Sequence, residues 1–498
     1  MGDLSRREFV KLSSGVLAAS GLSALPARPA RAGANDTVVL AMIGVHGRAG
    51  GLMQGFASHE GFKIKTLVDV DSRFLPDAVA RVEGRQGTRP GTVFGDFRKV
   101  LDDKDIDALI VGTPDHWHAI PTVFACQAGK HVYVEKPDGH NIREGRLMVA
   151  AARKYDRVVQ MGIQSRSGAH FAEAIDYLRG GAIGRALYAR AWESAKQGSI
   201  GRPADSTVPG GVDYDTWLGP APRRPFNPMR FHGNWRWFFD YGTGDLGNDG
   251  VHRLDMARRG LEAAVMARGG GPLGMPATAS ATGGKRYFDD MQEFPDTLFA
   301  TLDYADQKAT VLYEMRVWAP YKLDDEPEGA AIFGDAGYVV IANSRWRAFD
   351  PGGKVVAQGS SPNSQHEKAH RQDFLECIRG GGRPNCDIEV GHATSVMCHL
   401  GNIAWRVGRT LKFDAATETI LDDPEANALR ARTYRRPGCS RIGSNTTPRS
   451  GSTRDAPQRA TRGVIVVGAA GRAVLTKRPC GLGSRAAGFA FPPSPASL

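Results

Sequence analysis

The sequence has only six cysteines, and no two of them form a Cys-x-x-Cys pair. Because closely paired cysteines are the usual mark of a structural zinc site, no such site is expected. An even number would permit disulfides in an exported protein, but the wide and irregular spacing favours buried free thiols. The six are Cys126, Cys377, Cys386, Cys398, Cys439 and Cys480.

The central part of the chain also lacks an excess of charge of either sign, although the formal net charge is +11. The first 32 residues hold five basic and two acidic side chains, and the tail from Pro437 holds nine basic and one acidic. These two ends account for +3 and +8, so the body between them is neutral. A neutral body has no electrostatic reason to bind a phosphate backbone, and no nucleic-acid partner is expected.

The N-terminal apolar stretch, 12–25, is too short and too polar to anchor the protein in a membrane. It follows Ser5-Arg6-Arg7-Glu8-Phe9-Val10-Lys11, which resembles the twin-arginine export signal S-R-R-x-F-x-K at every fixed position. Ala30-Arg31-Ala32 then offers a small-residue cleavage site, and the absence of cysteine before Cys126 excludes lipid attachment there. We expect residues 1–32 to be a signal peptide, and the protein to be periplasmic or otherwise extracytoplasmic.

Between residues 38 and 163, apolar runs typical of buried strands alternate with stretches of helical periodicity. This alternation predicts a parallel sheet with helices on both faces, and hence an α/β domain of the Rossmann type over 33–160. The expected strands are 38–45, 62–69, 106–112, 132–135 and 158–163, and the expected helices are 48–58, 116–128 and 141–155.

After about residue 165 the pattern changes to a mixed, largely antiparallel second domain, which we place at 161–436. Strands are expected at 186–192, twice within 297–317 and again over 331–341, and helices at 171–178, 365–379 and 391–408. The tail, 437–498, is basic and rich in Gly, Ser, Thr, Pro and Ala. Such a segment cannot bury enough apolar surface, so a disordered extension or out-of-frame translation is favoured over a partner-binding tail.

The first expected strand ends in a glycine-rich loop, Ile43-Gly44-Val45-His46-Gly47-Arg48-Ala49-Gly50. A dinucleotide loop needs glycines so that backbone N–H groups can approach the pyrophosphate. Read as G-x-G-x-x-G, its three glycine positions hold Gly44, His46 and Ala49, so only the first is intact. Gly47 and Gly50 restore flexibility in a shifted register. The expected cofactor-binding residues of the loop are Gly44, His46, Gly47, Arg48 and Ala49.

Asp69 strengthens this interpretation, because it ends the next strand about 25 residues on, close to the spacing expected for a carboxylate on a ribose hydroxyl. An acid at this position favours NAD, since a 2′-phosphate would be repelled. Arg73 lies nearby and keeps NADP as an alternative. A strand-end cap is the simpler explanation of Asp69 that remains open.

Two further motifs point to proton and hydride chemistry on a hydroxyl group. Glu135-Lys136-Pro137 follows an apolar run, and Asn248-Asp249-Gly250-Val251-His252 follows a glycine-rich loop and opens a helical stretch. Oxidising an alcohol carbon requires removal of the hydroxyl proton, for which neutral histidine is suited near pH 7. In the first turn of a helix, the helix dipole would keep His252 neutral. A solvated lysine and a surface histidine are the alternatives.

Taken together, these motifs resemble the Gfo/Idh/MocA family, named for glucose-fructose oxidoreductase and inositol dehydrogenase, and in particular its exported branch. The resemblance covers about residues 37 to 436. It implies a Rossmann domain followed by an α+β domain with a large, mainly antiparallel open sheet, together with NAD(P) and sugar or polyol substrates. Homo-oligomers formed through the face of the second sheet are also implied. Its markers are 113–118, 135–137, 164–167 and the run from Trp217 to Asp255.

The resemblance also implies roles for single residues. Lys136 matches the lysine that orients the reacting hydroxyl, and His252 matches the general acid/base. Asn248 stands where several family dehydrogenases have an aspartate, and an amide can orient an imidazole but cannot stabilise an imidazolium. Arg166, Lys136 and His252 are the expected substrate-binding residues. The remaining cofactor-binding residues implied by the family are Thr113, Pro114, His118 and Glu135.

Two residue clusters remain open in function. The histidines at 116, 118, 131 and 140 match no familiar ligand set, so no metal is expected. The stretch 226–241 holds seven aromatic residues, which would suit stacking against a sugar ring, an aromatic core or an oligomer contact.

The sequence therefore predicts an NAD(P)-dependent oxidoreductase of a sugar or polyol hydroxyl. Some relatives instead hydrolyse glycosides by transient oxidation, elimination and re-reduction while NAD stays bound, and this is the first alternative. A non-catalytic sugar-binding protein is the second, although the presence of Lys136 and His252 argues against it.

Replacing Arg6 and Arg7 by lysine should stop export, because the twin-arginine pair is the fixed part of the signal. The precursor should accumulate in the cytoplasm, as seen by fractionation and immunoblotting, and the wild-type mature chain should start near Gly33. Normal export of the double variant would refute the assignment.

Overall fold

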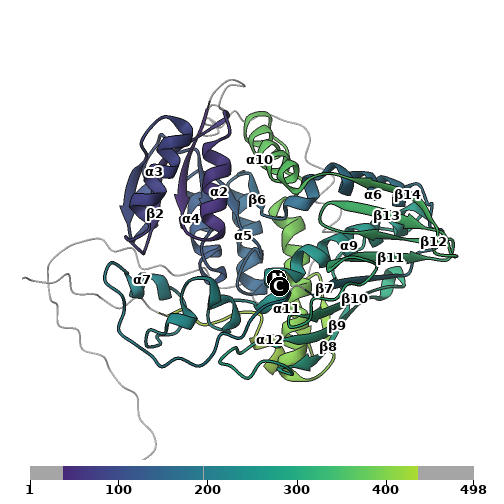
Figure 1. The fold of residues 1–498 in the computed structure, drawn as a ribbon. Helices are drawn as coiled ribbons and strands as arrows, with labels where there is room; N and C mark the ends of the chain where they lie inside the picture. The colour runs from purple at the N-terminus through teal and green to yellow at the C-terminus, as the bar shows by residue number, and fades with distance from the viewer. Residues whose placement is uncertain (1–36, 195, 436–498) are drawn as a thin grey trace, which may run out of the picture. The chain divides into compact units, whose positions relative to one another are not determined.

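The first half of the chain forms a six-stranded parallel sheet in the order β3-β2-β1-β4-β5-β6 (Figure 1). The structure is a computed structural model that describes residues 37–194 and 196–435. Its strands are β1 (Val38–Ile43), β2 (Phe62–Asp69), β3 (Gly91–Phe94), β4 (Ala108–Val111), β5 (His131–Val134) and β6 (Val159–Met161). The helices between them are α2 (Arg48–Ala57), α3 (Leu75–Gln86), α4 (Ala119–Gln127) and α5 (Ile142–Lys154).

The two faces of this sheet are buried against different helices because strand side chains alternate. Leu40 and Met42 of β1 pack in a core with α2 and α3, whereas Ala41 and Ile43 pack in a second core with α4 and α5. All four residues of β4 are buried. A strand covered on both faces reads as a continuous apolar run, which is why this domain was predictable from sequence.

The second half forms a ten-stranded sheet in the order β14-β13-β12-β11-β7-β10-β9-β8-β15-β16, in which only β7 and β10 pair in parallel. The mainly antiparallel second domain is thereby confirmed. Its strands are β7 (Tyr188–Glu193), β8 (Thr278–Gly284), β9 (Thr297–Tyr304), β10 (Ala309–Arg316), β11 (Glu328–Gly334), β12 (Gly337–Ile341), β13 (Arg345–Phe349), β14 (Val355–Ser360), β15 (Leu411–Asp414) and β16 (Thr419–Leu421).

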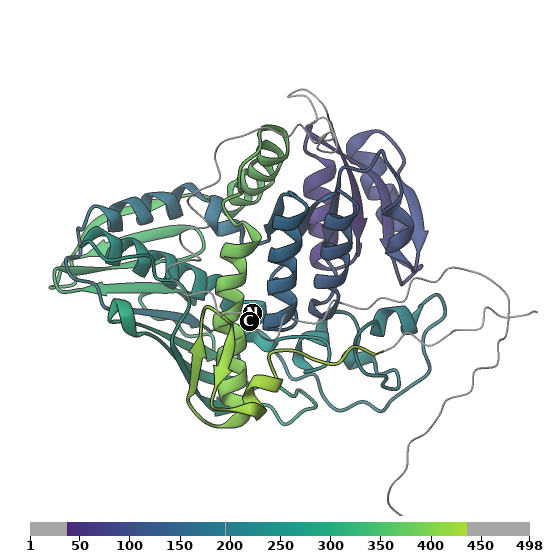
Figure 2. The same cartoon turned by 180° about the vertical axis from the view of Figure 1, so that it is seen from behind.

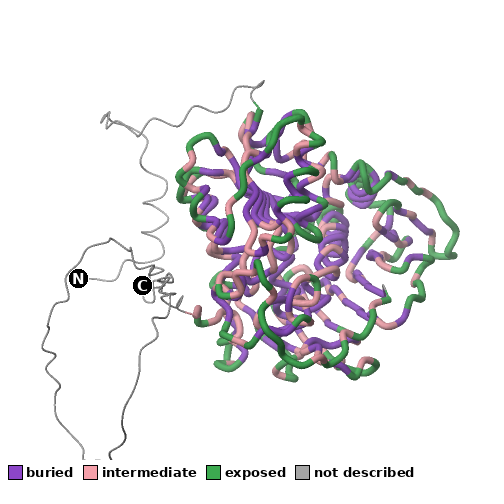
Figure 3. The backbone as a smooth tube through the Cα atoms, turned by 60° about the vertical axis from the view of Figure 1, so that its left-hand side comes forward, coloured by how far each residue is buried: buried purple, intermediate pink, exposed green. Residues whose placement is uncertain are grey.

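Helices α6, α9 and α11 share the largest apolar core with this second sheet. α11 also packs against α5 of the first half, and Figure 2 shows it running between the two sheets. Most residues of α9 and α11 are buried, as the purple tube in Figure 3 shows for the interior helices. The helices of this half are α6 (Ala169–Arg179), α7 (Tyr214–Leu218), α8 (Gly244–Asn248), α9 (Gly250–Ala267), α10 (Asn363–Gly380), α11 (Ile388–Val407) and α12 (Pro424–Ala428).

The closing helix α10 belongs to the first core although it lies in the second half of the sequence. Phe374, Leu375 and Ile378 are buried with residues of β1 and β2. The ring of Phe374 lies 6.3 Å from that of Phe62, and a side chain at Gly61 would come within 2.3 Å of Leu375. The chain therefore returns to the first sheet. The predicted domain boundary at residue 160 places α10 in the second domain and so leaves this contact out.

Several predicted boundaries were displaced. The helix expected over 116–128 is a short 3-10 turn, Asp115–Trp117, followed by α4, and the strand expected over 132–135 ends at Val134. Glu135 thus follows the strand, as Lys136 was expected to do. Helix α3 was not predicted, because only four of its residues are buried and charged residues dilute its apolar pattern.

The cysteine prediction is confirmed where it can be tested, since Cys126, Cys377, Cys386 and Cys398 are all buried and free. Cys439, Cys480, the predicted signal peptide at 1–32 and the predicted tail at 437–498 lie outside the described residues. Within 37–194 and 196–435, no helix combines the length and apolar content needed to cross a bilayer.

Truncating Phe374 to alanine should lower the free energy of unfolding by about 3–5 kcal/mol, because a fully buried ring would leave a cavity in the first core. Urea unfolding followed by circular dichroism measures the change. Val356→Ala, at an exposed apolar residue of β14, is the control and should change stability by less than about 0.5 kcal/mol. A comparably small effect at Phe374 would show that α10 does not stabilise the first domain.

Candidate functional site

A cavity of about 310 Å³ opens at the carboxyl edge of the parallel sheet. Loops that follow parallel strands meet at this edge, which is where ligands of open α/β sheets bind. Eleven of the predicted site residues line it: Gly44, His46, Gly47, Arg48, Asp69, Thr113, Pro114, His118, Glu135, Lys136 and Asn248. Ala49, Arg166 and His252 do not contribute to its wall.

Three small residues bring the glycine loop against the end of β4. Gly44 has φ +86°, and a side chain there would lie 3.0 Å from the carbonyl oxygen of Gly112. A side chain at Gly112 would in turn lie 2.7 Å from Cβ of Ala49. Ala49 therefore occupies the third glycine position of the motif without opening the loop, and it serves the site by packing rather than by lining the cavity.

The loop also presents an uncapped helix end to the cavity. α2 begins at Arg48, no side chain caps its first turn, and that turn contains no acidic residue. Gly47 has φ +57° and free space around its Cα, so the backbone is accessible there. Free N–H groups at a helix N-terminus attract anions, so the residues present fit the pyrophosphate of a dinucleotide.

The end of β2 is arranged to favour NAD over NADP. The two carboxylate oxygens of Asp69 accept hydrogen bonds from the backbone N–H groups of Val45 and Asp71, each at 2.9 Å, and burial raises its pKa. Arg73 is committed to the buried Asp71, with Nε 2.7 Å from its carboxylate. A 2′-phosphate would therefore meet a carboxylate and an arginine that is already paired.

A segment of the second half closes the other side of the cavity. Thr216, Trp217, His232, Trp235 and Arg236 contribute to its wall. The anchoring contacts include a bond from the N–H of Asp213 to the carbonyl of Val70 at 2.8 Å and a contact of His232 Nε2 with Asp71 at 3.0 Å. These wall residues were missed from sequence, where only the aromatic content of 226–241 gave a signal.

Most of that aromatic stretch proves to be core. Phe231, Trp237, Phe238 and Tyr241 are buried in the main apolar cluster of the second half. Only Trp235 among the aromatic side chains of 226–241 reaches the cavity wall. The core explanation therefore holds for most of the stretch.

Glu135 and Arg48 form an ion pair beside the cavity. Nε of Arg48 lies 3.0 Å from Glu135, and its guanidinium also contacts Glu367 of α10 at 2.8 Å. Gln164 donates a further hydrogen bond to Glu135 at 3.2 Å. The pair fixes the strand end directly before Lys136.

Two side chains predicted to bind the cofactor differ in whether they already have hydrogen-bond partners. The ring nitrogens of His118 lie 2.6 Å and 2.9 Å from the carbonyl oxygens of Pro137 and Thr113, so His118 holds the backbone. The hydroxyl of Thr113 is buried and has no hydrogen-bond partner among the described residues. Such an unpaired group in a cavity wall fits a polar atom of a bound ligand.

Lys136 reaches across to the second half of the chain. Its Nζ donates to the backbone carbonyl of Asn248 at 2.6 Å and to the side-chain oxygen of Asn248 at 3.0 Å. The amide nitrogen of Asn248 donates to Asp249 at 3.1 Å. Asn248 therefore holds Lys136 in place, and its side chain forms no hydrogen bond with the imidazole of His252.

His252 lies in the first turn of α9, directly after this contact, as expected. Burial lowers its pKa well below the usual value, and the positive charges of Lys136, Arg253 and Arg48 lower it further. The ring makes no hydrogen bond to any residue that the structure describes. A neutral imidazole with a free nitrogen can accept a proton.

The predicted substrate contact of Arg166 requires correction. Its guanidinium is buried and forms two hydrogen bonds of 2.8 Å with Asp255 of α9. A buried cation is retained only where a partner compensates its lost hydration, and here that partner is Asp255. Arg166 thus joins the turn after β6 to α9 instead of facing the cavity. The sequence motif around Arg166 does not show which of these two positions its side chain takes.

Two family models match the chain. The model described as "Oxidoreductase family, NAD-binding Rossmann fold" matches residues 38–163. The model described as "Oxidoreductase family, C-terminal alpha/beta domain" matches residues 189–262 and 355–438. Together they cover more than half of the chain.

Among curated proteins, a glycosyl hydrolase family 109 protein of Shewanella pealeana is 28% identical over 208 residues, 38% of this chain and 45% of that protein. A levoglucosan dehydrogenase of Pseudarthrobacter phenanthrenivorans is 29% identical over 184 residues, 37% of this chain and 40% of that protein. The matches thus span less than half the length of these relatives.

Solved structures share the fold. An aldose-aldose oxidoreductase of Caulobacter crescentus, complexed with glycerol, has a TM-score of 0.58 at 22% identity, covering 76% of this chain and 100% of that one. A levoglucosan dehydrogenase complexed with NADH and levoglucosan has a TM-score of 0.57 at 18% identity, covering 76% and 99%. These structures share the fold, and the family model that matches residues 38–163 shows that the first domain is an NAD-binding Rossmann domain.

Replacing Lys136 by methionine should raise the pKa of His252, because Lys136 is the neighbouring cation that lowers this pKa most. Burial remains, so the pKa should stay below its usual value. Nuclear magnetic resonance of 15N-labelled histidine side chains, assigned with His252→Gln, measures it. Lys63→Met, at an exposed lysine of β2, is the control and should leave the pKa unchanged. An unmoved pKa in Lys136→Met would place the two side chains too far apart to act on one hydroxyl.

Proposed function

The chain belongs to the Gfo/Idh/MocA oxidoreductase family, and we propose that it oxidises or reduces a hydroxyl-bearing carbon of a sugar or polyol with NAD. The observation that carries this proposal is the position of Lys136. It lines the cavity and donates to Asn248, shortly before α9, the helix that carries His252. A cation and a neutral base beside a dinucleotide site are the two groups that hydroxyl oxidation requires.

The residues that would hold NAD are the loop from Gly44 to Ala49, Asp69 and the turn at Thr113. When bound there, NAD supplies the acceptor or donor of a hydride. The residues at the end of β2 favour NAD over NADP, because Arg73 is already paired with Asp71 and is not free to bind a 2′-phosphate.

The protein's own groups divide the proton chemistry between them. An ammonium has three donors, and Lys136 uses two of them on Asn248, which leaves one for a substrate oxygen. That hydrogen bond would orient the hydroxyl and stabilise negative charge as its proton leaves. A ring nitrogen of His252 would accept the proton, and it would return the proton in the reverse direction.

A sugar substrate is supported by the family and by the named relatives, which include a levoglucosan dehydrogenase and an aldose-aldose oxidoreductase. The second candidate is glycoside hydrolysis with NAD retained. It is favoured by the glycosyl hydrolase family 109 relatives and by the segment with Trp217, His232 and Trp235, which closes the cavity wall. The two candidates share the oxidation step and the same residues.

Two further proposals concern location and assembly. Export by the twin-arginine route rests on the motif around Arg6 and Arg7 and on the cleavage site at Ala30-Arg31-Ala32. A homo-oligomer rests on the family alone, because its members often associate through the face of the second sheet.

The purified protein should release NAD on denaturation, as detected by mass spectrometry. Absorbance at 340 nm would then be followed with D-glucose, D-galactose, D-xylose, myo-inositol and levoglucosan, and with p-nitrophenyl glycosides of the three sugars. A dehydrogenase accumulates NADH with a free sugar or polyol. A hydrolase releases p-nitrophenol without net NADH. Neither signal, with NAD bound, would favour a non-catalytic protein.

Lys136→Ala and His252→Ala should each lower turnover by roughly 10²–10⁴-fold, because each removes a group that moves or stabilises a proton. NAD content should stay at the wild-type level, since neither side chain holds the dinucleotide. Arg259→Ala on the same helix is a control that should retain activity. Full activity of either catalytic variant would remove that residue from the mechanism.

A further inference from the structure

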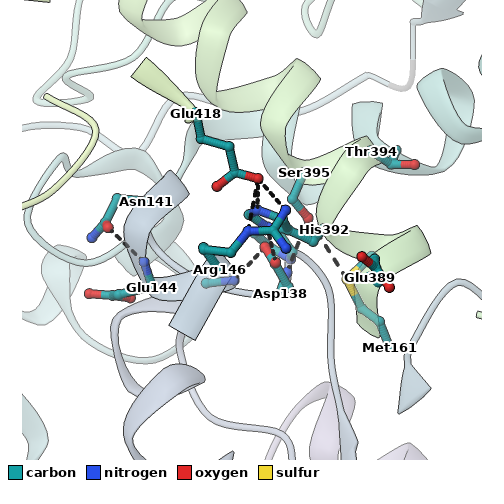
Figure 4. Close-up of polar contacts among 12 residues, drawn as sticks. Asp138, Asn141, Glu144, Arg146, Met161, Glu389, His392, Thr394, Ser395 and Glu418 are labelled. Carbon is teal, nitrogen blue, oxygen red and sulfur yellow. Dashed lines mark hydrogen bonds and ion pairs between the residues drawn. The ribbon is translucent and has the colours of Figure 1, made fainter. Parts of the chain in front are cut away.

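The turn that carries Lys136 is tied to α11 by a buried ion pair. Asp138 and His392 are both inaccessible to solvent, and Nδ1 of His392 lies 2.7 Å from the Asp138 carboxylate. Figure 4 shows His392 placed between Asp138 and Glu418, with Arg146 of α5 against Glu418. Nε2 of His392 lies 3.1 Å from Glu418.

Two carboxylates therefore enclose one imidazole. Burial alone would lower the pKa of His392, but Asp138 and then Glu418 outweigh it and raise the pKa to about 9. The imidazolium, the guanidinium of Arg146 and the two carboxylates make an electrically balanced group. With both ring nitrogens protonated, His392 donates to a carboxylate on each side.

The turn is fixed at further points, and no space is left around it. The N–H of Asp138 donates to the hydroxyl of Ser395 at 3.2 Å, and the N–H of Gly139 donates to the Asp138 carboxylate at 2.8 Å. A side chain at Gly145 of α5 would come within 2.1 Å of Asp138 and 2.3 Å of His392. The turn cannot shift without breaking these contacts.

The same helix also holds the element that carries His252. Two residues after His392 in α11, the hydroxyl of Thr394 donates to Asp255 of α9 at 2.9 Å. Within four residues, α11 thus contacts the turn of Lys136 through His392 and Ser395, and the helix of His252 through Thr394. α11 therefore sets the distance between the two candidate catalytic groups.

We propose that His392 is a positioning residue: as an imidazolium between Asp138 and Glu418, it fixes the turn that places Lys136 opposite His252. It touches neither cofactor nor substrate and acts only through Asp138. The inference rests on the proposed role of Lys136.

The pH dependence follows from the groups that face His392. These are Asp138 of the turn, Arg146 of α5, Glu418 of the β15–β16 turn and His399 one to two helical turns along α11. Because the pKa of His392 is raised above its usual value, the doubly bonded imidazolium is present at neutral pH and is lost as pH rises through about 9. Positioning of Lys136 should weaken over the same range.

The test compares His392→Gln and Asp138→Asn with His170→Gln, using the panel sugar or polyol that reduces the bound NAD fastest. His170 is an equally buried histidine, but its ring hydrogen-bonds Ser361 and Ala342 and no residue of the Lys136 turn. In His392→Gln, kcat should fall by roughly 10–10²-fold, since small misplacements have effects of that size. KM and NAD content should change little. His170→Gln should keep kcat within about 2-fold, even where both variants lose thermal stability.

The pH profile separates positioning from a general loss of stability. The wild-type kcat should decline as His392 loses its proton near pH 9. In Asp138→Asn this decline should begin at lower pH, because the carboxylate that most raises the pKa is gone. A profile of Asp138→Asn that matches wild type, or a folded His392→Gln with wild-type kcat, would overturn the proposal.

A spectroscopic readout keeps the test independent of activity. Labelling with 13C,15N-lysine gives each lysine Cε–Nζ group a resonance without altering its N–H donors, and Lys136→Arg identifies that of Lys136. This resonance should shift or broaden in His392→Gln and stay unchanged in His170→Gln, and an unchanged resonance in both would overturn the inference. If Lys136→Ala retained turnover, the proposed function would fail while this resonance still reported on positioning.

Discussion

The hydrogen bonds from Lys136 to Asn248 are the contact on which the site depends. They join the turn after β5 to the end of α8, shortly before α9, and so they connect the parallel sheet with the second domain at the edge of the cavity. Two ion pairs nearby limit the positions that Lys136 and Asn248 can take. The ion pair of Arg48 and Glu135 fixes the strand end on one side, and the ion pair of Arg166 and Asp255 fixes α9 on the other.

The cavity is a product of both halves of the chain. The Rossmann domain supplies the small residues and the uncapped helix end that suit a pyrophosphate, and the segment with Trp217 and His232 supplies the opposite wall. α10 adds a third connection, because its apolar face completes the core under β1 and β2. A bound dinucleotide would therefore contact residues whose positions depend on the packing of the whole molecule.

Local sequence patterns predicted much of this site. The loop at Gly44, the acid at Asp69 and the lysine at 136 were all expected at the ends of strands, and each lies at the cavity. His252 was expected in the first turn of a helix with a neutral ring, and burial and nearby cations give it that state. Two partners could not be read from the motifs. Arg166 and Asn248 were given roles from their motifs, but their observed partners, Asp255 and Lys136, are 89 and 112 residues away.

The sequence by itself determined the element types and the chemical groups, because periodicity and turn residues act over a few positions and leave a readable pattern. Which groups meet was decided only by the tertiary structure. His392 and Asp138 lie 254 residues apart, and no local sequence pattern around either residue predicts an ion pair. The packing of α11 against both α5 and α9 brings the two residues together, and their burial away from water strengthens the attraction between their charges. The pairing and the burial, not the residues alone, determine the charge state of the histidine and the place of the lysine.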